Sequence, residues 1–197
     1  MQRFKGGGLK MAVLEQNQEY TFTEFEVLNE SDDVKREFID NKIYLLASPS
    51  TAHQEVSMRL SLAFYPFFKN KNCKVFAAPF DVKLTKDDLD IQLVIPDLTV
   101  ICDKEGLNDK RYEGVPSLIV EILSPSNQHH DLIIKMNLYA KYGVKEYWIV
   151  NPMTKSISIY KLDETQHYIQ AAVKSSGKIQ SKLFEELSVN VDELFDF

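Results

Sequence analysis

A short apolar run lies near the middle of the chain, bounded by Pro116 and Pro125. Uninterrupted apolar character over so few residues is typical of a strand buried on both faces. One charged residue, Glu121, interrupts the run. A carboxylate there loses much of its hydration, which is costly unless a cation or strong hydrogen-bond donors meet it. The pattern predicts a fixed partner for Glu121 or a cleft at the strand end. The apolar residues are Leu118, Ile119, Val120, Ile122 and Leu123.

Two stretches repeat their apolar residues at helical spacing, which predicts helices over residues 51–70 and 128–142. Gly143 is expected to end the second helix, because glycine commonly follows a helix C-terminus. A shorter helix is expected between residues 21 and 31, with a threonine as its N-cap. These three segments are the expected helical part of the fold.

Apolar residues alternate with period two over residues 75–84 and dominate residues 93–102, which predicts strands. The first segment should contain a break, and the second contains a single acid within its apolar run, Asp97. Residues 35–46 and 156–173 are expected to form hairpins. Asp40 and Asn41 would supply the turn of the first hairpin, since both tolerate the left-handed backbone region.

Residues 115–150 read as strand, helix and strand, which implies at least one parallel strand pair. The hairpins imply antiparallel pairs, so the expected architecture is α/β, with a mixed β-sheet flanked by α-helices and additional β-hairpins. Residues 1–12 contain three consecutive glycines between basic residues and show no apolar period. They are expected to be a flexible leader, and residues 13–197 a single domain.

Composition and charge limit the classes of function. The chain is 44% hydrophobic and 26% charged, with a formal net charge of −6, so no general basic field indicates nucleic-acid binding. No apolar run is long enough to span a bilayer, and no signal-peptide pattern opens the chain. We therefore expect a cytoplasmic protein without a membrane partner. Cys73 and Cys102 lack a zinc motif and are expected to be buried free thiols, with a disulfide as the minor alternative.

Asp97, Glu121 and Lys135 form the candidate constellation. Two acids that lie in neighbouring apolar strands repel each other unless a divalent cation lies between them. Oxygen ligands favour Mg²⁺, Ca²⁺ or Mn²⁺ over zinc, and a lysine beside the ion could orient water and offset charge on a phosphate. The alternative is structural: one acid pairs with a basic side chain, the other accepts backbone donors, and Lys135 pairs with Asp131. His53, near a helix start, is more often a capping or solvated residue than a ligand.

Eight short motifs occur in an order that resembles the Uma-type restriction endonuclease family, and the match covers residues 20–195. That resemblance implies the restriction-endonuclease-like fold of the PD-(D/E)XK nucleases, with metal-bound acids at one strand end. The motifs are Arg36–Asn41, Pro49–Ser50, His53–Gln54, Phe80–Leu84, Pro96–Asp97, Glu121–Ser126, Asp131 with Lys135, and Gly143–Trp148.

The resemblance also implies residue roles. Asp97 and Glu121 would coordinate Mg²⁺, with Mn²⁺ as a substitute, and Glu37 would be a further metal or water ligand. Leu123 stands where the (D/E)XK motif normally has lysine, and the lysine role moves to Lys135 on the following helix. Ile95 stands where relatives often have glutamine.

The expected activity is therefore Mg²⁺-dependent hydrolysis of phosphodiester bonds in nucleic acid, with DNA as the expected substrate. A homodimer is suggested by nuclease relatives in which two active sites cut two strands. Two other classes stay open. One is a catalytically silent nuclease-fold module for binding or assembly, and the other is a metal-dependent hydrolase of a small phosphate compound.

Overall fold

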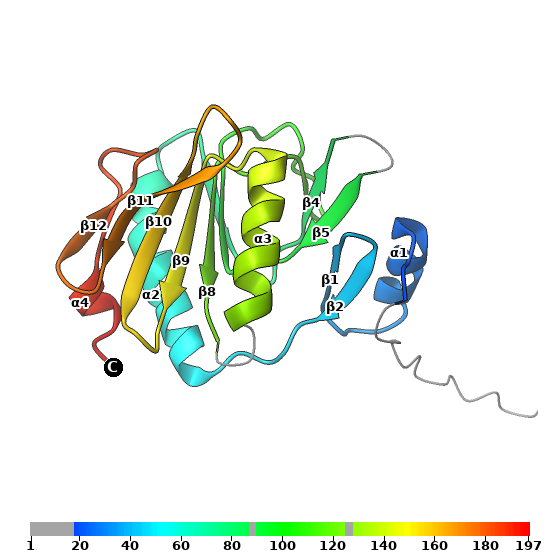
Figure 1. The fold of residues 1–197 in the computed structure, drawn as a ribbon, viewed down its shortest axis with the longest axis horizontal. Coiled ribbons are helices and arrows are strands. Elements are labelled where there is room, and N and C mark those ends of the chain that lie inside the picture. The colour runs from blue at the N-terminus through cyan, green and yellow to red at the C-terminus, as the bar shows by residue number, and fades with distance from the viewer. Residues whose placement is uncertain (1–17, 87–89, 125–127) are drawn as a thin grey trace, which may run out of the picture.

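A computed structural model describes residues 18–86, 90–124 and 128–197, with side chains described from residue 133 onward in the last range. The expected leader, residues 1–12, lies outside the described residues. Figure 1 shows a layered α/β arrangement in which helices pack beside the two larger of the three β-sheets. No helix in the described part of the chain is long and apolar enough to cross a membrane.

The larger sheet has six strands in the order β11-β10-β9-β8-β6-β3. Its central pair, β8 and β9, is parallel, and its other pairs are antiparallel, so the expected mixed sheet is confirmed. The bounds are β3 Lys74–Ala77, β6 Leu98–Ile101, β8 Leu118–Ile122, β9 Glu146–Asn151, β10 Ser156–Leu162 and β11 Tyr168–Lys174.

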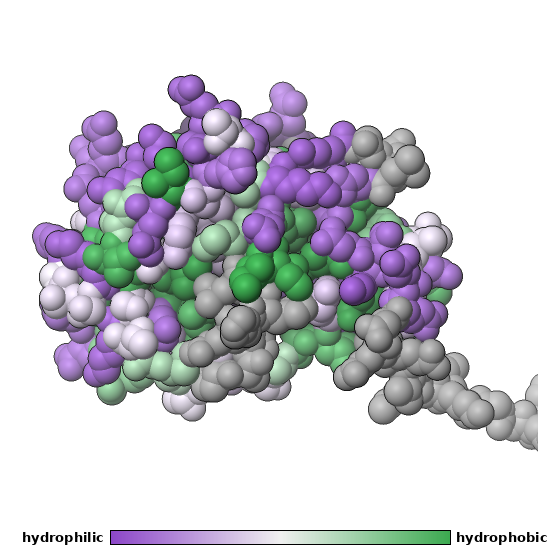
Figure 2. All heavy atoms as spheres, viewed as in Figure 1, coloured by the Kyte–Doolittle hydropathy of each residue, from purple (hydrophilic) through white to green (hydrophobic). Residues whose placement is uncertain are grey.

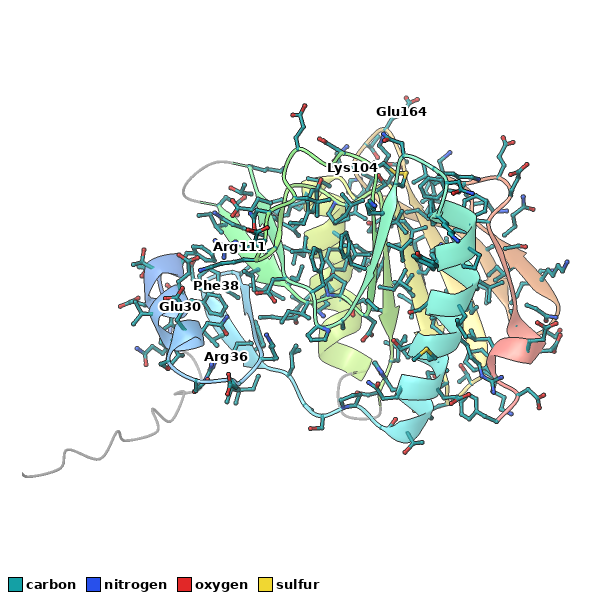
Figure 3. The ribbon with its side chains drawn as sticks, turned by 180° about the vertical axis from the view of Figure 1, so that it is seen from behind. Glu30, Arg36, Phe38, Lys104, Arg111 and Glu164 are labelled. Atoms are coloured by element: carbon teal, nitrogen blue, oxygen red, sulfur yellow. A yellow bond between two sulfur atoms is a disulfide. The ribbon has the colours of Figure 1, made fainter. Side chains whose placement is uncertain are left out.

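Two long helices cover opposite faces of this sheet (Figures 1 and 3). Helix α2, Thr51–Phe68, packs Leu60 and Phe64 into one core cluster with alternate residues of β8, among them Val120. Helix α3, Gln128–Tyr142, packs Tyr139 into a second cluster with Ile119. Because successive strand residues point to opposite faces, Glu121 points to the α3 side, as Ile119 does.

The second sheet has five strands in the order β2-β1-β5-β4-β7 and packs its apolar residues into the cluster that contains α3. Asp40 and Asn41 form the β1–β2 turn with φ values of 47° and 60°, as the sequence predicts. Helix α1, Phe22–Glu30, begins at a capping box formed by Thr21 and Glu24 and buries Phe25 against this sheet. The strands are β1 Arg36–Ile39, β2 Lys42–Leu45, β4 Val82–Thr85, β5 Ile91–Val94 and β7 Tyr112–Glu113.

The predicted strands over 75–84 and 93–102 each cross from one sheet to the other. The first divides into β3 and β4 around Pro79, and the second divides into β5 and β6 around Pro96. Proline has no backbone N–H to donate to a ladder, which suits it to such breaks. Asp97 therefore lies between the two sheets and not within a continuous strand.

The C-terminal segment closes one end of the six-stranded sheet. It forms a small hairpin and a one-turn helix, and Val191 and Leu194 are buried in the α2 cluster. Its bounds are β12 Lys178–Gln180, β13 Ser188–Asn190 and α4 Val191–Leu194. On the face drawn in Figure 2, hydrophilic side chains gather over β4 and β5, and hydrophobic ones gather over part of α3.

The prediction of free cysteines is wrong, because Cys73 and Cys102 form a disulfide. The register of β3 against β6 pairs Lys74 with Ile101, so the next residues outward, the two cysteines, face each other with their Cα atoms 3.9 Å apart. They are 29 residues apart in sequence, and only the pairing of the two strands brings them together. Because neither cysteine is a free thiol, the cysteines do not support the expectation of a reducing compartment.

Candidate active site

A cavity of about 500 Å³ lies where the two sheets and both long helices meet. The C-terminal end of β8 and the first turns of α2 and α3 converge toward the lower edge of Figure 1, beside the β1–β2 hairpin. Asp97, Glu121 and Lys135 all line this cavity, and so does His53. The structure thus brings together three of the four predicted site residues at one opening, and Glu37 contacts Lys135 directly.

Asp97 follows Pro96 in the link between β5 and β6, and its side chain is 15% exposed. Its Oδ2 accepts a hydrogen bond of 2.7 Å from the backbone N–H of Ile122, at the end of β8. Its Oδ1 lies 3.2 Å from Nε2 of His53. The carboxylate is thereby fixed next to the strand that carries Glu121.

Glu121 is buried in β8, where its backbone pairs with β9. Its Oε1 accepts hydrogen bonds from the Tyr139 hydroxyl at 2.6 Å and from Lys135 Nζ at 3.1 Å. Burial raises the pKa of Glu121 to about 8; the charge of Lys135 opposes this rise, and the nearby carboxylate of Asp97 adds to it. The fixed partner that the apolar run requires is therefore the Lys135–Tyr139 pair on α3.

Lys135 lies between two carboxylates. Its side chain is only 4% exposed, and Nζ lies 2.9 Å from Oε1 of Glu37 and 3.1 Å from Oε1 of Glu121. Leu123, at the position where the motif normally has lysine, is buried in the α3 cluster. A lysine on the following helix thus reaches the motif glutamate. The alternative partner, Asp131, has its side chain outside the described residues.

Glu37 belongs to β1, between two residues that face the other way. Arg36 and Phe38, labelled in Figure 3, lie on the α1 side of the strand, where Arg36 pairs with Asp32. Glu37 points inward and is 3% exposed. Its Oε1 accepts the backbone N–H of Ile95 at 2.8 Å as well as Lys135 Nζ. Glu37 therefore holds Lys135 and ties β1 to the segment that leads to Asp97.

Two further residues belong to the site that sequence reasoning did not assign to it. The hydroxyl of Tyr139 donates a hydrogen bond to Glu121, and burial followed by the charge of Glu121 raises the pKa of Tyr139 well above the usual value. The sequence contains a signal for the role of Tyr139, because Tyr139 is four residues after Lys135 and lies on the same helix face. His53, which its position alone predicts to be capping or solvated and which matches a family motif position of unclear role, contacts Asp97. Asp81 does not line the cavity; burial raises the pKa of Asp81, and the charges of Lys35 and Arg111 oppose the rise.

The cavity offers carboxylate and imidazole side chains as possible ligands for an ion. Among residues 18–86, 90–124 and 128–197, no group of three or more His, Cys, Asp or Glu side chains is arranged to hold a metal ion. A structural zinc site requires four such ligands. Mg²⁺ instead takes one or two carboxylates and keeps several waters, with substrate phosphate completing the octahedron. Asp97 and Glu121 are two carboxylates that line the same cavity.

The fold is an α/β architecture of the restriction-endonuclease-like type. The chain belongs to the Uma2 family, described as "Putative restriction endonuclease", whose model matches residues 22–192. It is 27% identical over 168 residues to slr1290, a protein of Synechocystis sp. described as uncharacterized, and the match covers 82% of this chain and 83% of that protein.

A solved structure shares the fold. It is described as that of a "putative nuclease belonging to DUF820" from Anabaena variabilis. The TM-score is 0.67 at 17% sequence identity, over 83% of this chain and 91% of the other. At that identity the likeness shows the fold alone, and the restriction-endonuclease-like fold expected from the sequence is confirmed.

Proposed function

We propose that the protein is a Mg²⁺-dependent endonuclease that hydrolyses phosphodiester bonds in nucleic acid, with DNA as the expected substrate. The observation that carries this proposal is the buried lysine Lys135, held between Glu37 and Glu121 at a cavity that also exposes Asp97. Membership of the Uma2 family supports a nuclease, and the pair of acids suits Mg²⁺ or Mn²⁺.

Asp97 and Glu121 would hold the ion, which when bound supplies Lewis-acid polarisation of a phosphoryl oxygen and lowers the pKa of a bound water. Lys135 would orient the attacking water and offset negative charge that develops on the phosphoryl oxygens. Glu37 would hold the Lys135 side chain in place. Tyr139 would fix the Glu121 carboxylate through its donated hydrogen bond.

The burial of the site residues also limits their contact with water. Glu121 and Lys135 are 7% and 4% exposed, so their charges act in a medium far less polar than bulk solvent. A charge placed there interacts more strongly with a transition state than the same charge at the surface. The net charge of −6 is the opposing feature, because nucleic acid is repelled by a general negative field. The ion itself would supply part of the missing positive charge at the site.

A cleavage assay tests the proposal. Supercoiled plasmid, single-stranded DNA and RNA are incubated with the protein in Mg²⁺, in Mn²⁺ and in a chelator. We expect metal-dependent cleavage that falls at least about a hundredfold in Asp97→Asn and Glu121→Gln, the scale typical for loss of a main electrostatic contributor. Glu164→Gln is the matched control, because Glu164 is exposed at the β10–β11 turn, at the end of the molecule opposite the site (Figure 3).

The substrate panel separates the remaining classes. Cleavage of a small phosphodiester but of no polynucleotide would assign the site to a small phosphate compound. Absence of cleavage from every substrate with either ion would contradict the enzyme and favour a silent binding module. We also propose a homodimer, for which direct conversion of supercoiled to linear plasmid and a dimeric mass in solution are the expected results.

A further inference from the structure

His53 is the third residue of α2, and its side chain reaches the predicted metal ligand Asp97. Its Nε2 lies 3.2 Å from Oδ1 of Asp97, and its side chain is 12% exposed. The other carboxylate oxygen accepts the backbone N–H of Ile122 at 2.7 Å. One oxygen of Asp97 thus accepts a backbone N–H from the end of β8, and the other lies beside the imidazole of α2.

The backbone around His53 is fixed by its own contacts. Ser50 is the N-cap of α2, and its side chain accepts the backbone N–H of His53 at 3.2 Å. Val56 and Leu60, on the next turns, are fully buried against the six-stranded sheet. The imidazole is thus carried by a rigid helix start, which is the kind of support that holds a functional group in register.

The contact between the His53 ring and Asp97 is not required for helix capping or for solvation of the ring. Within the described part of the chain, Nδ1 is buried and has no hydrogen-bond partner, so Asp97 is the partner of the ring. Burying an unpaired ring nitrogen is unfavourable. A histidine that only capped the helix could avoid the cost of an unpaired ring nitrogen by turning its ring toward solvent. The ring of His53 instead places Nε2 3.2 Å from Oδ1 of Asp97.

We propose that His53 is a positioning residue for Asp97, a role that rests on the proposed function of Asp97 as a metal ligand. An Nε2–H donated to Oδ1, opposite the Ile122 N–H on Oδ2, prevents rotation of the carboxylate. The remaining lone pairs then face a fixed direction, so the ion meets a preformed ligand. Hydrogen-bond partners that orient metal ligands commonly change metal affinity by about 10–100-fold when removed.

Calorimetric titration with Mn²⁺ at one fixed pH tests this role. His53→Leu keeps much of the volume and removes the donor, whereas His53→Gln places an amide N–H near the position of Nε2. We expect the Mn²⁺ dissociation constant to rise about 10–100-fold in His53→Leu and to stay within a few-fold of wild type in His53→Gln. His167→Leu, at the exposed β10–β11 turn, is the matched control and should bind as the wild type does.

The outcomes are distinct. Equal Mn²⁺ affinity in wild type and His53→Leu overturns the positioning role and leaves the proposed function standing. A wild type that binds no Mn²⁺ overturns both. If His53→Leu does not fold, the comparison moves to His53→Gln and His53→Asn, since asparagine places its amide near Nδ1; equal affinity in that pair overturns the role.

Discussion

Replacing Lys135 with methionine isolates the charge between the two sheets, because methionine keeps an unbranched apolar stem and removes Nζ. The side chains of Glu37 and Glu121, 4% and 9% exposed, would lose their shared cation. At an effective dielectric constant of about 20, a contact near 3 Å carries roughly 5 kcal/mol of Coulomb energy, much of it offset by dehydration. Breaking a buried pair by removing one partner costs about 3–5 kcal/mol, which is the loss expected here.

The loss should depend on pH. The pKa of Glu121 is about 8 in the folded protein against an ordinary value of 4.5, so the folded state retains a proton that the unfolded state releases. Stability therefore falls as pH rises from about 4.5 to 8. Without Lys135 that pKa rises further. Both proteins keep the Glu121 proton below about pH 8, so the deficit of the variant should be nearly constant there and should grow as pH rises above about 8.

Urea denaturation of wild type and Lys135→Met at about pH 6 and about pH 9.5, on either side of the folded pKa of Glu121, measures this difference. Lys141→Met is the matched control on the same helix; its side chain is 45% exposed and pairs with Asp90, so about 1 kcal/mol or less is expected. A Lys135→Met variant within about 1 kcal/mol of wild type at about pH 9.5 would refute the reasoning. So would a deficit of equal size at both pH values.

Three other predictions concern buried groups and the disulfide. Glu121→Gln should flatten the pH dependence of the unfolding free energy between about pH 4.5 and 8; an unchanged slope would show that another group titrates there. Glu146 is fully buried and accepts four hydrogen bonds from Trp148 and residues 181–183, so Glu146→Leu should cost about 3 kcal/mol or more without changing Mn²⁺ affinity. Unaltered stability would contradict that structural role. The free energy of unfolding of Cys73→Ser/Cys102→Ser should be about 3–4 kcal/mol lower than that of wild type, because the disulfide closes a loop with a sequence separation of 29. Thiol titration of the denatured wild type should find no free thiol.

Local patterns predicted most of the elements because their signals lie within a few residues. The run around Glu121 became β8, the following helix ends at Gly143 with a φ of 90°, and the parallel β8–β9 pair follows from the strand–helix–strand unit. The acid in an apolar strand also pointed correctly to a buried partner. These inferences need only periodicity, capping residues and the cost of burying charge.

Other features depend on which elements become neighbours. The strand predicted over residues 93–102 is divided between two sheets, and Pro96 marks the bend without revealing that the halves pair differently. The pairing of Cys73 with Cys102 requires the β3–β6 register. The contact between His53 and Asp97 joins a helix start to a loop 44 positions away, which no spacing rule encodes.

The most direct measurement locates a divalent ion in crystals soaked with Mn²⁺, whose anomalous scattering identifies it. The proposal predicts one ion within roughly 2.0–2.6 Å of a carboxylate oxygen of Asp97 and of one from Glu121. The same crystals of Glu121→Gln should show no ion at that position. An ion bound elsewhere, or none while Lys135 keeps both carboxylate contacts, would contradict a metal-dependent nuclease site at the end of β8.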